Sequence, residues 1–160
     1  MGEKMVEFRF AEENDIPIIL KFIKELAEYE GMLDKVEANE ELLKKWLFEK
    51  ERAEVIFVLE EGKEVGQALF FHNFSTFQGR AGIYIEDLYV TPDYRGKGYG
   101  IGLIKELARI TVERGCGRLE WGCFDFNTPS IEFYLGLGAE PVDEWTVYRV
   151  SGETLEHFSK

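Results

Sequence analysis

The chain has 160 residues, 45% of them hydrophobic and 14% aromatic, and its 31 acidic and 19 basic side chains give a formal net charge of −12. This length and composition are typical of a globular protein with a sizeable core, and we expect a single domain over residues 1–160. The acidic balance argues against nucleic-acid binding and is compatible with a cationic ligand.

Membrane, export and metal functions have no support in the sequence. No apolar run reaches the roughly 18 residues that a membrane span needs. The segment from Met1 to Met5 lacks the apolar core of a signal peptide. Cys116 and Cys123 lack the spacing of zinc ligands and have no histidine nearby. We therefore expect a cytoplasmic protein with no membrane partner, no nucleic-acid partner and no metal.

The N-terminal part of the chain predicts a strand followed by a helix. Val6 to Phe10 alternates between apolar and polar residues, as a half-buried strand does. Asn14 or Asp15 is suited to cap the next helix, which runs to Tyr29 and stops at Gly31.

A second helix and a strand hairpin come next. Asn39 is predicted to cap the helix, and its inward-facing residues are expected to be Leu42, Leu43, Trp46 and Leu47. Ala53–Glu60 and Glu64–Phe74 predict two strands joined by a tight turn, with Ile83–Val90 as a third antiparallel strand. We expect the acidic pair Glu60-Glu61 to be a solvated face.

The third strand changes phase in its middle. Ile83 and Ile85 share one face by the period of two, whereas Leu88 and Val90 have the other parity. This shift predicts one inserted residue, a β-bulge, near Glu86-Asp87. The alternative is a strand buried on both faces, where parity carries no information.

A glycine-rich basic segment follows the strand. After the turn at Thr91-Pro92-Asp93, the run Arg95-Gly96-Lys97-Gly98-Tyr99-Gly100 opens directly into an amphipathic helix that reaches Arg114. Its expected apolar face is Ile101, Ile104, Leu107, Ala108, Thr111 and Val112. Glycines at a helix N-terminus let an anion approach backbone N–H groups, so the segment predicts a phosphate site. The alternative is glycine used for packing only.

The C-terminal third of the chain predicts a strand, a short helix and a further strand. Arg118–Phe124 is expected to be a strand. A short helix with Thr128 as cap and Pro129 at its first position is expected to end near Gly136 or Gly138. Trp145–Val150 is predicted to close the sheet. Hairpin strands followed by a strand–helix–strand crossover predict an α/β protein with a mixed sheet.

Two other phosphate-binding motifs do not match the same segment. A dinucleotide fingerprint needs a glycine three residues after its second glycine, but Ile101 stands three after Gly98. The loop of the phosphate-binding NTPases needs Ser or Thr after its lysine, but Gly98 follows Lys97.

The segment fits the Q/R-x-x-G-x-G/A signature of a known family, and further motifs extend the match. These are Ile23–Glu30, Glu86-Asp87, Asn127-x-Pro129-Ser130, Tyr134 and Gly138-Ala139. The chain resembles the GCN5-related N-acetyltransferases, and within them the spermidine/spermine and thialysine acetyltransferase branch. The resemblance implies the acyl-CoA N-acyltransferase fold, in which helices flank a splayed central mixed sheet.

The resemblance also implies acetyl-CoA as co-substrate, with the glycine-rich segment around its pyrophosphate. Near the strand, backbone N–H groups are expected to serve the pantetheine arm and the oxyanion. The implied cofactor contacts are Leu88, Tyr89, Val90, Arg95, Gly96, Lys97, Gly98, Tyr99, Gly100, Asn127 and Ser130. For Asn127 and Ser130, simple turn and cap chemistry is the alternative.

Catalytic and acceptor residues follow from the same resemblance. Tyr134 is implied to be the general acid, since a phenol with a pKa of about 10 stays protonated at neutral pH. A core aromatic three residues after Ile131 is the alternative reading. Glu86 is implied to face the substrate amine, directly or through a water molecule, to bind it first and to help remove its proton second. Asp87, Tyr29 and Glu30 are implied to line the same site. For Glu86 and Asp87 the alternative is a solvated bulge or a salt bridge, and for Tyr29 and Glu30 it is a simple helix end.

These assignments predict an N-acetyltransferase that acts on a primary amine of a small cationic acceptor, such as the polyamine spermidine. Thialysine, lysine-like amino acids or a peptide amine are alternative acceptors. A non-catalytic acyl-CoA sensor is the alternative class. The resemblance further implies a homodimer.

Overall fold

The computed structural model describes residues 4–160, and Met1 to Glu3, on which part of the signal-peptide argument rests, lie outside the described residues. The chain divides after Gly122 into two compact units. The single domain over residues 1–160 stays a prediction. Within residues 4–160, no helix has the length and apolar character needed to cross a bilayer.

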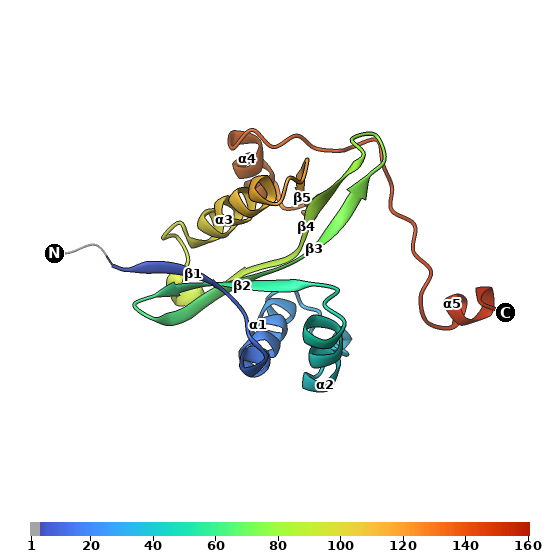
Figure 1. Ribbon diagram of the computed structural model, residues 1–160, viewed down its shortest axis with the longest axis horizontal. Coiled ribbons are helices and arrows are strands. Elements are labelled where there is room, and N and C mark those ends of the chain that lie inside the picture. The colour runs from blue at the N-terminus through green and yellow to red at the C-terminus, as the bar shows by residue number, and fades with distance from the viewer. Residues whose placement is uncertain (1–3) are drawn as a thin grey trace. The chain divides into compact units, whose positions relative to one another are not determined.

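The first unit is a five-stranded sheet in the order β1-β2-β3-β4-β5. All neighbours are antiparallel except β4 and β5, which are parallel, so the predicted mixed sheet is confirmed. Helices α1 and α2 cover one face and α3 covers the other (Figure 1). The strands are β1 (Val6–Phe10), β2 (Glu54–Glu60), β3 (Lys63–Ser75), β4 (Arg80–Val90) and β5 (Leu119–Trp121).

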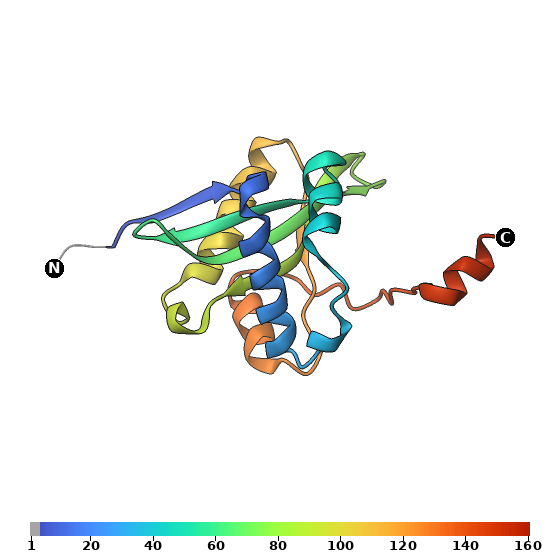
Figure 2. The same cartoon turned by 90° about the horizontal axis from the view of Figure 1, so that it is seen from below.

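The helices of this unit are α1 (Ile16–Tyr29), α2 (Glu40–Leu43) and α3 (Tyr99–Glu113). Seen from below in Figure 2, α1 runs across the sheet. Three short 3₁₀ turns also occur, at Glu13–Asp15, Leu33–Lys35 and Pro92–Tyr94. Pro17 lies in the first turn of α1, and Gly31, with φ +72°, follows its end, as predicted.

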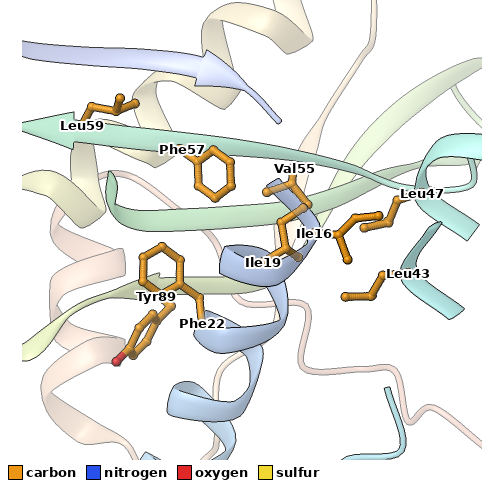
Figure 3. Close-up of a cluster of buried hydrophobic side chains, with 9 residues drawn as sticks. All are labelled: Ile16, Ile19, Phe22, Leu43, Leu47, Val55, Phe57, Leu59 and Tyr89. Atoms are coloured by element: carbon orange, nitrogen blue, oxygen red, sulfur yellow. The ribbon is translucent and has the colours of Figure 1, made fainter. Parts of the chain in front are cut away.

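The core on the α1 side lies between that helix and the sheet (Figure 3). Phe22 contacts the ring of Phe57 at 6.4 Å and that of Tyr89 at 5.7 Å between centroids. The buried cluster consists of Ile16, Ile19, Phe22, Leu43, Leu47, Val55, Phe57, Leu59 and Tyr89. Burial of an aromatic side chain of this kind stabilises a fold by about 1.5–3 kcal/mol, so this cluster anchors α1 firmly to β2 and β4.

The second helix confirms one prediction and corrects another. Asn39 caps it, its side-chain oxygen accepting a hydrogen bond from the N–H of Leu42 at 2.8 Å. Leu42 and Trp46 were expected to pack inward, but they are 40% and 45% exposed. For Trp46 the reason is that α2 gives way after Leu43 to a π-helical segment, Lys44–Glu49, which changes the angular spacing of the side chains. In α2 itself, Leu43 is the buried residue and its neighbour Leu42 points away.

The buried face of α3 also differs from the predicted one. Ala108 and Val112 are exposed, Val112 to 78%. The buried residues are Tyr99, Leu103, Ile104, Leu107, Ile110 and Thr111. The buried stripe therefore starts at Tyr99 and continues through Leu103, and the sequence pattern alone did not distinguish it from the overlapping stripe that starts at Ile101.

The second unit contains α4 (Thr128–Gly136) and α5 (Gly152–Phe158). The cap of α4 is Asn127 rather than the predicted Thr128, and its side chain accepts a hydrogen bond from the Ser130 N–H at 3.3 Å. The predicted closing strand, Trp145–Val150, forms no strand pairing among residues 4–160. Apolar alternation favours a strand, but it does not specify the edge with which that strand pairs.

Candidate active site

The centre of the candidate site is an irregularity in β4. In the register of β3 and β4, Leu69 pairs with Asp87 but its neighbour Phe70 pairs with Ile85. Glu86 is therefore the extra residue of a β-bulge, and the bulge predicted at Glu86-Asp87 is confirmed.

Before the bulge, β4 is hydrogen-bonded to β5 and to Arg118, the residue directly before it. The N–H of Ile83 donates to the carbonyl of Arg118 at 3.0 Å. The parallel pairing with β5 ends at Ile85 and Trp121. The two strands thus stop pairing at the bulge, and this is the splayed sheet that the resemblance implied.

After the bulge, the alternation of the β4 backbone N–H and C=O groups between β3 and the opposite side is shifted by one residue. The N–H of Thr91 donates to the carbonyl of Val65 in β3, at 2.9 Å. Because backbone groups alternate in direction along an antiparallel strand, those of Leu88 and Val90 point away from β3. The bulge therefore turns the Leu88 and Val90 N–H groups towards the side where β5 pairing has ended.

Tyr89, between them, has a different position. It pairs in register with Gln67 of β3, and its ring belongs to the α1 core. Its hydroxyl donates to the carboxylate of Glu25 at 2.9 Å. Burial, together with the Glu25 hydrogen bond, raises the pKa of Tyr89 to about 12.

The glycine-rich segment forms a left-handed turn into α3. Gly96 and Gly98 have φ of +77° and +86°, a conformation that residues with a side chain rarely adopt. Gly98 is the N-cap of α3, and no side chain caps the helix there. A Cβ at Gly100 would meet nothing within 4 Å. The first N–H groups of α3 are thus approachable, and with the exposed Lys97 they suit a pyrophosphate.

Arg95 ties this loop to the end of α1. Its Nε donates to the carbonyl of Val90 at 2.9 Å. Its guanidinium carbon lies 4.7 Å from the ring centroid of Tyr29 and 5.6 Å from that of Tyr89. Tyr29 is 72% exposed, so Arg95 holds a ring that is otherwise in solvent.

Three carboxylates gather at the bulge and the end of α1. Asp87 is half-buried, and Glu86 beside it is exposed. Burial, followed by the charges of Glu86 and Glu30, raises the pKa of Asp87 to about 6. This arrangement suits a cation, because an ammonium group near these carboxylates relieves their mutual repulsion. The structure therefore brings together the predicted acceptor residues Glu30, Glu86 and Asp87.

The remaining predicted residues lie in the second unit, on α4 and its cap. Asn127 and Ser130 share the cap hydrogen bond. The rings of Phe133 and Tyr134 are 5.8 Å apart between centroids. Burial, with the nearby Cys123 thiol, raises the pKa of Tyr134, so this phenol holds its proton more firmly than a free one.

One site-related residue was missed. Glu60 was expected on a solvated face, but it is only 6% exposed and accepts a hydrogen bond from Tyr99 of the glycine-rich segment. The available signal was parity, since Ile56, Val58 and Glu60 share one face of β2, the face towards α3.

Comparison with known proteins gives the class. Residues 20–139 match the acetyltransferase (GNAT) family, and the chain belongs to this family. A thialysine N-epsilon-acetyltransferase from Bos taurus is 36% identical over 96% of this chain and 97% of its own length. A spermidine/spermine N(1)-acetyltransferase-like protein 1 from Homo sapiens is 30% identical over 93% of this chain, which corresponds to 23% of that protein.

A solved structure agrees with the fold. An integron cassette protein from the mobile metagenome of V. cholerae superposes with a TM-score of 0.80 at 30% identity, covering 97% of this chain and 98% of that one. The predicted family and fold are confirmed, and the chain is an N-acetyltransferase of the branch that includes the thialysine and spermidine/spermine enzymes. GNAT enzymes use acetyl-CoA. Among residues 4–160, no group of three or more His, Cys, Asp or Glu is arranged to hold a metal ion.

Proposed function

We propose that this chain transfers the acetyl group of acetyl-CoA to the terminal primary amine of a small lysine-like acceptor such as thialysine. The carboxylate cluster of Glu30, Glu86 and Asp87 beside the bulge is the observation that carries the proposal. The thialysine acetyltransferase, which aligns along nearly its whole length, supports this acceptor class.

The cluster binds the acceptor as an ammonium ion. Three carboxylates attract the cation, and its arrival favours the charged form of Asp87. The same attraction favours the protonated, unreactive amine. We therefore assign Glu86 to binding first and to proton removal second, with a water molecule carrying the proton to its exposed carboxylate.

The cofactor residues are assigned from backbone donors. The N–H groups from Arg95 to Gly100, with the side chain of Lys97, hold the pyrophosphate. The N–H groups of Leu88 and Val90 serve the pantetheine arm and the developing oxyanion, and Asn127 and Ser130 are further cofactor contacts. When bound, acetyl-CoA supplies an activated acetyl thioester.

The final proton comes from Tyr134. Its Oη donates a proton to the departing thiolate. Because the pKa of this phenol is raised, it is still protonated at neutral pH and has that proton to give. A family member without an acid would bind the cofactor and release no product, as an acyl-CoA sensor does.

A polyamine such as spermidine is the second candidate acceptor. The net charge of −12 and the three clustered carboxylates favour a ligand with several positive charges. The name of the human relative points the same way.

An acceptor panel tests the proposal. CoA thiol release from acetyl-CoA is measured with thialysine, lysine, ornithine, spermidine, spermine, putrescine and a basic peptide. We expect the highest kcat/KM with thialysine. Preference for spermidine would overturn the lysine-like acceptor in favour of the polyamine, and cofactor binding without turnover of any amine would favour the sensor.

We also propose a homodimer in which Trp145–Val150 pairs with a second copy. Trp145, Val147 and Tyr148 are 74%, 85% and 91% exposed, and the segment has no strand partner within residues 4–160. Exposed apolar residues of this kind mark association surfaces. Light scattering should give the mass of a dimer for the wild type and of a monomer for Val147→Lys, and a monomeric wild type would contradict the proposal.

A further inference from the structure

We propose that Glu60 is a positioning residue for the cofactor loop, where it holds Tyr99 and Lys97 so that the N–H groups at the start of α3 are set for the pyrophosphate. This inference rests on the proposed use of acetyl-CoA. It gives a function to a buried carboxylate that takes no part in the proposed chemistry.

Glu60 is held by three donors. Its Oε1 accepts from the Tyr99 hydroxyl at 2.5 Å and from the Lys97 Nζ at 3.4 Å. Its Oε2 lies 3.6 Å from the Nζ of Lys4. The carboxylate is 6% exposed and Tyr99 is 8% exposed, so the hydrogen bond between them is shielded from water.

A carboxylate in this position requires its partners. A buried charge is costly unless it is paired and hydrogen-bonded, and here two ammonium groups and a phenol supply the pairing. The Tyr99 hydrogen bond, with Lys4 and Lys97 nearby, holds the pKa of Glu60 below its usual range. Glu60 therefore stays ionised at neutral pH and remains a strong acceptor for the loop.

The loop depends on this anchor because of its composition. Gly96, Gly98 and Gly100 have no side chains that pack, so the conformation of the turn is fixed from the residues between them. Tyr99 and Lys97 are those residues, and both end on the same oxygen of Glu60. A pre-arranged loop loses less conformational entropy when it binds a ligand.

The direction of the change in CoA affinity distinguishes a positioning role of Glu60 from an electrostatic effect of its charge. Glu60 and a pyrophosphate are both anionic, so removal of the Glu60 charge alone would strengthen cofactor binding. Loss of a positioning residue would weaken it. The Lys97 side chain, 40% exposed, stays able to turn towards the phosphate in either case.

Calorimetric titration with CoA tests the proposal in the wild type, Glu60→Gln, Tyr99→Phe and the double variant. We expect each single variant to bind CoA about tenfold more weakly, the loss typical of a hydrogen bond to a charged group. Because Glu60 acts through Tyr99, the double variant should be little weaker than either single one. The KM for S-acetylpantetheine, which lacks the pyrophosphate, should stay unchanged.

A second readout needs no cofactor. In the free protein, the first hydrogen-bonded N–H groups of α3, beginning with that of Gly102, which donates to the Gly98 carbonyl at 2.9 Å, should exchange with deuterium faster in Glu60→Gln and Tyr99→Phe than in the wild type. Ile110→Ala is the matched control, because it removes a buried side chain from the far half of the same helix. It should lower the Tm without weakening CoA binding.

Three results would overturn the inference. CoA affinity that is unchanged or tighter in Glu60→Gln would mean that Glu60 does not position the loop. An equal loss for S-acetylpantetheine, or in Ile110→Ala, would mean a general structural role. A wild type that fails to bind CoA would overturn the proposed function as well, so the two failures are distinguishable.

Discussion

The guanidinium of Arg95 stacks on the ring of Tyr29, with 4.7 Å between the guanidinium carbon and the ring centroid. Arg95 begins the glycine-rich loop, and Tyr29 ends α1 directly before Glu30. One side-chain contact therefore joins the loop assigned to the cofactor and the helix end assigned to the acceptor.

Loss of the Tyr29 ring should loosen this link. An exposed cation–π contact contributes about 0.5–1 kcal/mol, so Tyr29→Leu should raise the acceptor KM by about two- to fivefold. Tyr29→Phe keeps the ring and should match the wild type. Steady-state kinetics with thialysine checks both variants, and a Tyr29→Leu variant with wild-type KM would show that the contact plays no part in acceptor binding.

The ionised side chain of Asp87 should lower the free energy of unfolding at neutral pH. The fold raises its pKa from 3.8 to about 6, so it favours the protonated form, and the resulting stabilisation is present below pH 4 and lost as the pH rises through 6. At pH 7.5 the ionised group costs up to about 3 kcal/mol, and Asp87→Asn should recover part of this free energy of unfolding. Urea unfolding at pH 7.5 and pH 4 measures it. A variant that is less stable than the wild type at both pH values would contradict the prediction.

Acceptor binding should weaken in acid for the same reason. As the pH falls through about 6, Asp87 takes up a proton and the cluster loses one of its charges. The KM for thialysine should therefore rise below this pH in the wild type. In Asp87→Asn the KM should be higher than in the wild type at pH 7.5 and nearly independent of pH, so that the two proteins converge as the pH falls below about 6. A wild-type KM that is flat from pH 7.5 to 5 would remove Asp87 from the acceptor site.

Alanine substitutions at two glycines should change the stability of the protein in opposite directions and weaken CoA binding in both cases. Gly98→Ala forces a side chain into φ +86° and should destabilise the protein by about 1–2 kcal/mol. Gly100→Ala lies in helix with open space around it and should stabilise the protein by about 0.5–1 kcal/mol. Both should weaken CoA binding, because a methyl group at either position obstructs a phosphate. Thermal unfolding and calorimetry measure the two quantities, and wild-type CoA affinity in Gly100→Ala would count against close backbone approach.

Local patterns in the sequence predicted the parts of the site that depend on local geometry. The parity change between Ile85 and Leu88 predicted the bulge, since one extra residue inverts the alternation of a strand. The glycines of the segment 95–100 predicted a helix N-terminus with approachable N–H groups, and α3 begins there with Gly98 as an N-cap that no side chain covers.

Features that depend on distant partners were not predictable in this way. Glu60 looked like a solvated residue because its partners Tyr99 and Lys97 lie almost 40 positions along the chain. Trp46 was misplaced because a π-helical segment changes the phase that a helical pattern assumes. Trp145–Val150 has the alternation of a strand, but alternation does not specify which edge will pair with it.

The most direct test of the account is thiol release with thialysine by the wild type and Tyr134→Phe, with CoA affinity measured in parallel. We predict clear turnover in the wild type and a kcat lower by about 10²–10⁴ in the variant, the usual contribution of a general acid, with unchanged CoA affinity. Equal kcat values would contradict the role of Tyr134. Absence of wild-type turnover with every terminal amine would contradict the central claim.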